Sequence, residues 1–229
     1  MEIFIGSLLE GARQASGVVA VIDVFRAFTT AAVALANGAS RIVMVSTVEE
    51  AFALRDSGFG DVCMGEVRGR KPDGFDFGNS PFEVAGVDFG GKTIIQRTSA
   101  GTQGIVAAAG ADRLYAASLV TAKATAAALS ASGPVRVALV AMGDSGVART
   151  DEDELCALHL RNLLEGRPGD PEAVRRLILA GGEVARFNDP ARPHLRWQDV
   201  EIALDSDRYD FAIRVRTEDG RPVGRIETA

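Results

Sequence analysis

The sequence contains 229 residues, of which 25 are lysine or arginine and 31 are aspartate or glutamate, so its formal net charge is −6. This acidic balance argues against a general nucleic-acid binder, which needs a basic surface to neutralise phosphates. Hydrophobic residues make up 47% and charged residues 24%, so a core can form without a structural metal or disulfide, and we expect one domain over residues 1–229.

Short runs rich in β-branched residues alternate with alanine-rich segments along most of the chain. The predicted strands are residues 18–23, 41–45, 61–64, 92–97, 113–116 and 135–140. The predicted helices are residues 27–37, 49–57, 102–109, 122–130, 153–164 and 171–180. A β-hairpin is predicted over residues 211–215 and 222–226, around Glu218-Asp219-Gly220. Because the strands are apolar throughout, we expect an α/β fold: a three-layer, doubly wound, mostly parallel sheet with helices on both faces and a C-terminal β-hairpin.

The sequence predicts a cytoplasmic protein without membrane association. The longest apolar runs, residues 18–22 and 137–142, are too short to cross a bilayer. Glu2 stands where a signal peptide would carry lysine or arginine. Cys63 and Cys156 fall within apolar strand and helix patterns, and we expect both to be buried free thiols.

Polar residues follow four of the predicted strands. In an open parallel sheet, ligands bind in the crevice beyond the carboxyl ends of the strands. The four clusters begin at Asp23, Gly65, Thr98 and Gly143. We expect them to meet at one edge of the sheet, and this coincidence predicts a binding site.

The first cluster contains Asp23 and Arg26. Asp23 is placed either to bind a hard cation or act as a nucleophile, or to cap the helix that follows, and the sequence favours these interpretations equally. Arg26 can hold a carboxylate, phosphate or sulfonate with two parallel hydrogen bonds, the ordinary alternative being an arginine that faces solvent.

The other clusters have similar pairs of interpretations. The turn 98–104 opens a helix and predicts phosphate binding by backbone N–H groups, or simply a tight connection. Ser80 and Glu83 form a predicted capping box, which leaves Asn79 for a ligand. Asp153 is either a metal ligand or one of several acids at a helix start. The loop 67–78 is expected to be solvated, and it could fold over a bound anion.

Several catalytic classes are disfavoured by context. Residues 86–93 match the Walker A pattern, but the motif enters a strand instead of a helix, which argues against a nucleotide site. Neither His159 nor His194 has a local context that indicates a metal pair or phosphohistidine. Neither cysteine has an arginine six residues later, and the DxDxT phosphatase signature is absent after Asp23. The remaining groups, carboxylates, arginines and backbone amides, are those of a Mg²⁺ site.

Four sequence blocks together resemble the 2-phosphosulfolactate phosphatase family, which is associated with coenzyme M synthesis. The blocks are residues 23–30, Gly65-Glu66 with 74–81, 97–102, and Glu152-Asp153 with Cys156-Ala157. The resemblance extends from the first predicted strand to about Leu164. Phe25 and Phe28 stand where the family more often carries leucine and threonine.

The resemblance implies a Mg²⁺-dependent phosphatase that converts (R)-2-phospho-3-sulfolactate to (R)-3-sulfolactate and phosphate. By inference we assign Asp23, Glu66 and Asp153 to the metal, and Asp23 and Arg26 to catalysis. The residues expected to bind substrate and phosphate are Asn79, Arg97, Thr98, Ser99, Gly101 and Thr102. Attack by Asp23 and attack by water both remain open.

Three alternatives are kept. The substrate can be another 2-phosphohydroxy acid, since the family name does not fix it. The protein can instead be a nucleotide-dependent kinase or ligase that uses the Walker-like stretch, or a non-catalytic binder of a small anion. The expected partner is a small anionic phosphorylated substrate; a homodimer is left open.

Overall fold

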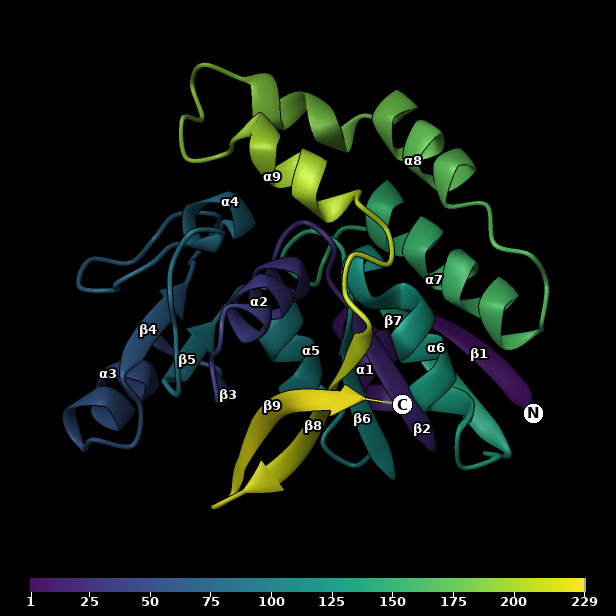
Figure 1. The fold of residues 1–229 in the computed structure, drawn as a ribbon, viewed down its shortest axis with the longest axis horizontal. Coiled ribbons are helices and arrows are strands. Elements are labelled where there is room, and N and C mark those ends of the chain that lie inside the picture. The colour runs from purple at the N-terminus through teal and green to yellow at the C-terminus, as the bar shows by residue number, and fades with distance from the viewer. Residues whose placement is uncertain (229) are drawn as a thin grey trace.

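The computed structural model describes residues 1–228, so Ala229, the last residue of the expected domain, lies outside it. One nine-stranded sheet, in the order β1-β7-β2-β6-β8-β9-β3-β5-β4, has helices on both faces (Figure 1). The strands are β1 (Glu2–Ser7), β2 (Val18–Ile22), β3 (Arg41–Val45), β4 (Val62–Gly65), β5 (Thr93–Arg97), β6 (Arg113–Ala117), β7 (Arg136–Ala141), β8 (Phe211–Glu218) and β9 (Arg221–Thr228). Most neighbouring strands run parallel, so the predicted fold class is confirmed.

The C-terminal hairpin joins two parallel blocks of the sheet. β1, β7, β2 and β6 form one block, and β3, β5 and β4 form the other. β8 pairs antiparallel with β6, and β9 pairs antiparallel with β3, so the hairpin lies between the blocks (Figure 1). Its turn uses Asp219 and Gly220 at φ 49° and 77°, the positive values that tight hairpin turns require. The hairpin is confirmed, but it occupies the middle of the sheet.

Helices cover each face because the buried strands have two apolar faces. In β2, Val19 and Val21 pack on one face, whereas Ala20 and Ile22 pack on the other. The first face carries α1, α2 and α5, and the second carries α3, α6 and α7. The helices are α1 (Leu8–Gln14), α2 (Ala27–Ala36), α3 (Val48–Asp56), α4 (Pro81–Val84), α5 (Gly101–Ala107), α6 (Ala122–Ser130), α7 (Asp151–Leu164), α8 (Pro171–Ala180) and α9 (Trp197–Ala203), with the 3₁₀ helices η1 (Leu119–Thr121) and η2 (Glu183–Asn188).

The sequence analysis did not identify β1, α1, η2 or α9. β1 passes directly into α1 at Ser7 and Leu8 without a loop, so no turn residues mark the boundary. α1 and α9 each contain seven residues, too few for a clear helical periodicity. Long-range pairing with β7 decides the conformation of β1.

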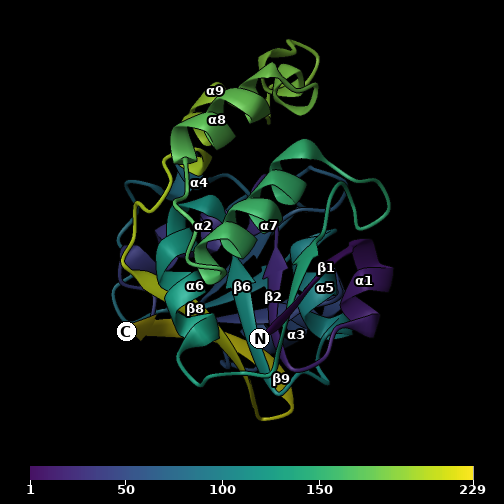
Figure 2. The same ribbon diagram turned by 90° about the vertical axis from the view of Figure 1, so that its right-hand side faces the viewer.

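A cap made of α8, η2 and α9 (171–203) lies beyond one end of the sheet (Figures 1 and 2). The register aligns Ile22 with Ala117 and Ala141, so the residues that follow β2, β6 and β7 lie side by side at the same level. Among residues 1–228, the helices are all too short or too polar to cross a membrane. The cap and the strand ends together enclose the pocket described next.

Candidate functional site

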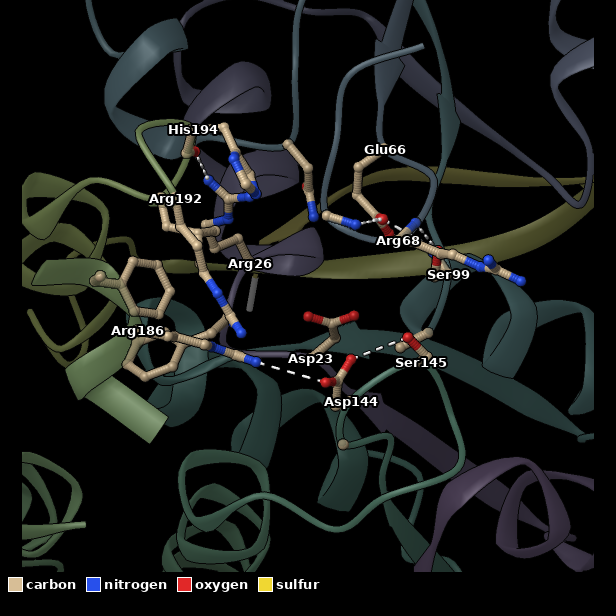
Figure 3. A pocket seen from close by; sticks show the side chains of 17 residues that line it. Asp23, Arg26, Glu66, Arg68, Ser99, Asp144, Ser145, Arg186, Arg192 and His194 are labelled. Carbon is tan, nitrogen blue, oxygen red and sulfur yellow. Dashed lines mark hydrogen bonds and ion pairs between the residues drawn. The ribbon is translucent and has the colours of Figure 1, made fainter. Parts of the chain in front are cut away.

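A pocket opens where the carboxyl ends of the strands meet the cap (Figure 3). All four polar clusters predicted from the sequence contribute to its lining, as expected. Its residues come from the ends of β2, β4, β5 and β7, the start of α4 and the cap: Asp23, Phe25, Arg26, Glu66, Arg68, Gly69, Asn79, Ser99, Ala100, Gly143, Asp144, Ser145, Arg186, Phe187, Arg192, His194 and Leu195. Segments distant in sequence therefore form one cavity.

Asp23 lies in the pocket and also caps a helix. Its Oδ1 accepts a hydrogen bond from Ala27 N at 2.9 Å, which satisfies a free N–H at the start of α2. Its Oδ2 accepts from Gly101 N at 2.8 Å. Burial raises the pKa of Asp23 to about 6; the two backbone N–H donors lower it, and the negative charge of Glu66 raises it. The structure thus confirms the helix cap and places Asp23 at the pocket, whereas cation binding or nucleophilic attack by Asp23 stays a prediction.

Glu66 is the second carboxylate of the pocket. It follows β4, where Gly65 pairs with Arg97, so it stands beside the end of β5. Its carboxylate accepts hydrogen bonds from Ser99 N, Ser99 Oγ and Gly69 N. Only 6% of Glu66 is exposed. Glu66 and Asp23 line the same pocket, and the negative charge of Glu66 contributes to the raised pKa of Asp23.

Asn79 supplies an unpaired polar atom to the same pocket. The residue is buried, and its Oδ1 has no hydrogen-bond partner among the described residues. Ser80 caps α4 as predicted, because its Oγ accepts from Glu83 N at 3.2 Å. The predicted return bond differs, since the Glu83 carboxylate accepts from Gly78 N at 3.0 Å instead of from Ser80 N. The Oδ1 atom of Asn79 is therefore available on the pocket, and its role in ligand binding stays a prediction.

Two backbone N–H groups of the turn after β5 are already paired with carboxylates of the protein. Ser99 N donates to Glu66 and Gly101 N donates to Asp23, so carboxylates of the protein occupy these donors. Thr98 and Thr102 bond to each other through their hydroxyl and backbone groups. Of the turn residues assigned to phosphate, only Ser99 lines the pocket in the described chain. Gly101 N holds Asp23, and Thr98 and Thr102 hold the turn itself.

Replacing Gly101 with alanine is expected to destabilise the protein by about 1–3 kcal/mol through overpacking and to lower activity. An added Cβ would lie 2.9 Å from Asp23 Oδ2, 2.9 Å from Ala27 Cβ and 3.0 Å from Phe28 Cζ. Urea unfolding and substrate turnover measure the two effects. Gly110→Ala is the matched control, because its Cβ would have no atom within 4 Å and both properties should stay near wild type.

The two arginines assigned from the sequence have different positions. Arg26 lines the pocket, but its Nη1 donates to Asp199 Oδ2 at 2.8 Å and to His194 O at 3.1 Å. Arg97 does not line it; its Nη1 donates to Glu66 O at 2.7 Å and to Ser99 Oγ at 3.2 Å. Arg26 therefore links the pocket to the cap, and Arg97 positions Glu66 and Ser99 instead of contacting the cavity.

Asp153 is also placed behind the pocket wall. Its Oδ1 accepts from Val24 N at 2.7 Å and its Oδ2 accepts from Gly143 N at 2.8 Å. Burial raises its pKa well above the usual value, and the charges of Glu152 and Asp23 add to this effect. Asp153 thus holds the segments that carry Asp23 and Asp144. Its position does not favour the metal-ligand role assigned from the sequence.

The cap contributes pocket residues that sequence analysis missed. Arg186, Arg192 and His194 lie on or beside η2, where no periodic pattern indicates their orientation. Burial lowers the pKa of His194, and the charges of Arg70, Arg26 and Arg192 lower it further. Phe187 and Leu195 are the other cap residues that the sequence analysis did not name, whereas the remaining lining residues belong to the predicted clusters or to the loop 67–78: Phe25, Arg68, Gly69, Ala100, Gly143, Asp144 and Ser145. The one sequence feature that could have indicated these cap residues is the arginine-rich composition of residues 186–196 in an otherwise acidic chain.

The polar atoms of the pocket fit a hard cation. Within residues 1–228, no three His, Cys, Asp or Glu side chains form a complete metal-binding group. However, Mg²⁺ characteristically takes one or two carboxylates and completes its coordination with water and substrate oxygens. Asp23 and Glu66 supply two carboxylates, and the unpaired Asn79 Oδ1 supplies a third oxygen on the same pocket. The donor set is therefore compatible with Mg²⁺.

The Walker-like segment 86–93 precedes β5 and does not line this pocket in the described structure. Gly91 N donates to Gly38 O and Lys92 N donates to Phe89 O, so these groups form a tight loop. Carboxylates opposite arginines, at the strand ends of an α/β sheet, instead define an enzyme-type site for a small anion. The 2-phosphosulpholactate phosphatase family model matches residues 4–186, and the chain belongs to this family of phosphoric monoester hydrolases.

Similar proteins come from several bacteria. The chain is 34% identical over 203 residues to a protein of Bacillus subtilis (strain 168), covering 86% of each chain. It is 37% identical to a protein of Symbiobacterium thermophilum, covering 76% of this chain and 75% of the relative. A protein of Carboxydothermus hydrogenoformans is 48% identical over 47% of this chain and 44% of its own. Each relative carries the name probable 2-phosphosulfolactate phosphatase.

Proposed function

We propose that this protein is a Mg²⁺-dependent phosphatase acting on a small 2-phosphorylated hydroxy acid, with (R)-2-phospho-3-sulfolactate as the first candidate substrate. The products would be (R)-3-sulfolactate and phosphate. The observation that carries the proposal is the pocket in which Asp23 and Glu66 face cap arginines (Figure 3). The family match and the names of the relatives support the same substrate class.

In this proposal, Asp23, Glu66 and the amide oxygen of Asn79 hold the cation. When bound, Mg²⁺ would neutralise charge on the phosphoryl oxygens and favour nucleophilic attack. Asp23 is fixed by Ala27 N and Gly101 N, so its orientation is set before substrate arrives. Arg186, on the cap side of the pocket, is fixed by ion pairs with Glu183 and Asp144 and would offset only part of the negative charge of the substrate.

The direct test measures phosphate release from 2-phospho-3-sulfolactate, 2-phospholactate and 2-phosphomalate, with Mg²⁺ and with EDTA. We expect release from at least one of them, only with the metal. Phosphate release from another compound of the panel, and not from 2-phospho-3-sulfolactate, would support phosphatase activity on a different substrate. Saturable binding without release under any condition would instead indicate a non-catalytic anion binder.

Metal binding is expected to depend on pH through Asp23. Because its pKa is raised to about 6, Asp23 is protonated below that pH, and Mg²⁺ affinity should fall by about tenfold per pH unit there. The effect on metal-free stability has the opposite sign. Because the pKa of folded Asp23 lies above its ordinary value of 3.8, the contribution of this group to stability decreases as pH rises from 3.8 to about 6. Titration calorimetry measures the Mg²⁺ affinity, and urea unfolding measures the metal-free stability, each at pH values from 4.5 to 7.5. Metal affinity independent of pH would remove Asp23 from the cation site.

We further propose that the reaction serves a coenzyme M-type pathway in the cytoplasm. Cys63 and Cys156 are buried free thiols, as predicted, which fits a reducing compartment. Deleting the gene should then cause the phosphorylated sulfonate to accumulate in cell extracts. Unchanged levels would argue against this pathway.

A further inference from the structure

Of the four arginines that line the pocket, Arg26 and Arg186 are already committed to carboxylates of the protein. Arg68 lies on the side of Ser99, to whose Oγ its backbone N–H donates, and Arg192 belongs to the cap. Arg26 forms a buried ion pair with Asp199 at 2.8 Å. Arg186 lies 3.0 Å from Glu183, 3.7 Å from Asp144 and 4.0 Å from the buried Glu152. Such pairing fixes these guanidinium groups and compensates much of their charge.

Arg192 is much less compensated. Its one ion pair in the described chain is with Asp189 at 3.4 Å, and side-chain exposures of 53% and 39% mean that solvent screens this pair. In Figure 3, Arg192 comes from the cap loop on the side of the pocket opposite Ser99 and Glu66. Arg192 also lowers the pKa of His194, so positive charge gathers on this wall. Arg192 is therefore available to pair with an anion that enters the pocket.

The backbone that carries Arg192 is anchored at several points. Arg192 N donates to Asp189 O, and Leu195 N donates to Arg192 O, both at 2.9 Å. Arg26 Nη1 holds the carbonyl of His194 at 3.1 Å, and the same nitrogen is fixed by the fully buried Asp199. The cap loop is thus tied to the first turn beyond β2, next to Asp23. A preorganised cation binds an anion with a smaller loss of conformational entropy.

Arg192 and the residues proposed to bind the cation come from different segments of the pocket. Asp23 and Glu66 follow strands and Asn79 precedes α4, whereas Arg192 belongs to the cap. Phe187 and Leu195 of the cap also line the pocket and provide apolar contact for a short carbon chain. Arg192 lies outside residues 4–186, the part of the chain that the family model matches. These features indicate that the cap side of the pocket recognises the part of the substrate that remains after the phosphoryl group is removed.

We propose that Arg192 binds the terminal acid group that the substrate keeps, and thereby makes the enzyme selective for phosphomonoesters with a second anion beyond the phosphorylated carbon. This inference rests on the proposed phosphatase function and names its substrate class more closely. The preferred terminal group is a sulfonate or carboxylate, which a guanidinium binds with two parallel hydrogen bonds. A substrate that ends in a methyl group leaves Arg192 without a partner.

The test compares wild type and Arg192→Met on 2-phospho-3-sulfolactate, 2-phosphomalate and 2-phospholactate. For the first two, kcat/KM should fall about 10- to 100-fold, mainly through KM, because one charged hydrogen-bonding contact is lost. The value for 2-phospholactate should change less than about threefold. Arg192→Lys should recover part of the loss, because it retains the charge. A purely structural effect would lower all three values alike and would overturn the proposal.

A binding measurement separates this inference from the proposed catalytic function. Calorimetry compares (R)-3-sulfolactate with lactate on wild type, Arg192→Met and the control Arg176→Met, whose arginine is exposed on α8 outside the pocket lining. If sulfolactate binding depends on Arg192 although no phosphate is released, the selectivity proposal stands and the phosphatase proposal fails. If phosphate is released but the variant treats all substrates as wild type does, the selectivity proposal fails. If wild type binds sulfolactate no better than lactate, it fails as well.

Discussion

Asp23→Asn is expected to reduce turnover by at least ~100-fold, the largest catalytic effect of any single change in the pocket. The carboxylate supplies negative charge for the cation or attacks phosphorus, and asparagine does neither well. The substitution also places an amide N–H₂ group against one of two backbone donors, Ala27 N or Gly101 N. Steady-state phosphate release measures the first effect, and the Mg²⁺-induced shift in thermal unfolding measures metal binding independently of turnover.

Asp153→Asn is the matched control for this experiment. Asp153 is also a buried carboxylate that accepts from two backbone N–H groups, but it does not line the pocket. Both variants should lose stability, whereas only Asp23→Asn should lose the Mg²⁺-induced shift. If Asp153→Asn abolishes that shift and Asp23→Asn retains it, Asp153 is the ligand and Asp23 is a helix cap. Near-normal turnover by Asp23→Asn would remove Asp23 from the mechanism.

Asp199→Leu is expected to cause the largest loss of stability, about 3–5 kcal/mol, because it leaves the buried charge of Arg26 without its partner. Both side chains are at most 5% exposed. Asp199 also accepts hydrogen bonds from Ser80 Oγ at 2.6 Å and Phe82 N at 3.1 Å, so one carboxylate joins the cap, α4 and the first turn after β2. Urea unfolding gives the free energy of unfolding, and activity should fall as the cap loosens.

Two further variants test the cause of that loss. Asp205→Leu breaks an exposed ion pair with Arg208 close to the end of α9, and it should cost at most about 1 kcal/mol because solvent screens the pair. Arg26→Met combined with Asp199→Leu should recover part of the stability, because no unpaired charge remains. Equal losses for Asp199→Leu and Asp205→Leu would show that the buried pair has no special role.

Local sequence pattern predicted most of the fold because each buried strand carries its own signal. β2 and β7 are apolar on both faces, and the helices that cover them are rich in alanine. The pattern did not place the hairpin between β6 and β3, because strand order depends on pairings between distant segments. It also missed β1, whose conformation depends on pairing with β7 across the sequence.

The sequence by itself determined which polar residues stand at the strand ends, since Asp23, Glu66 and Ser99 each follow their strands directly along the chain. Only the tertiary structure decided what these residues contact. It paired Ser99 N with Glu66 and Gly101 N with Asp23, so part of the turn after β5 holds carboxylates of the protein, and phosphate binding by this turn stays a prediction. It also brought Asp199 to Arg26 across 173 residues, and with it the arginines of the cap. Such contacts depend on chain packing, which leaves no periodic trace in the local sequence.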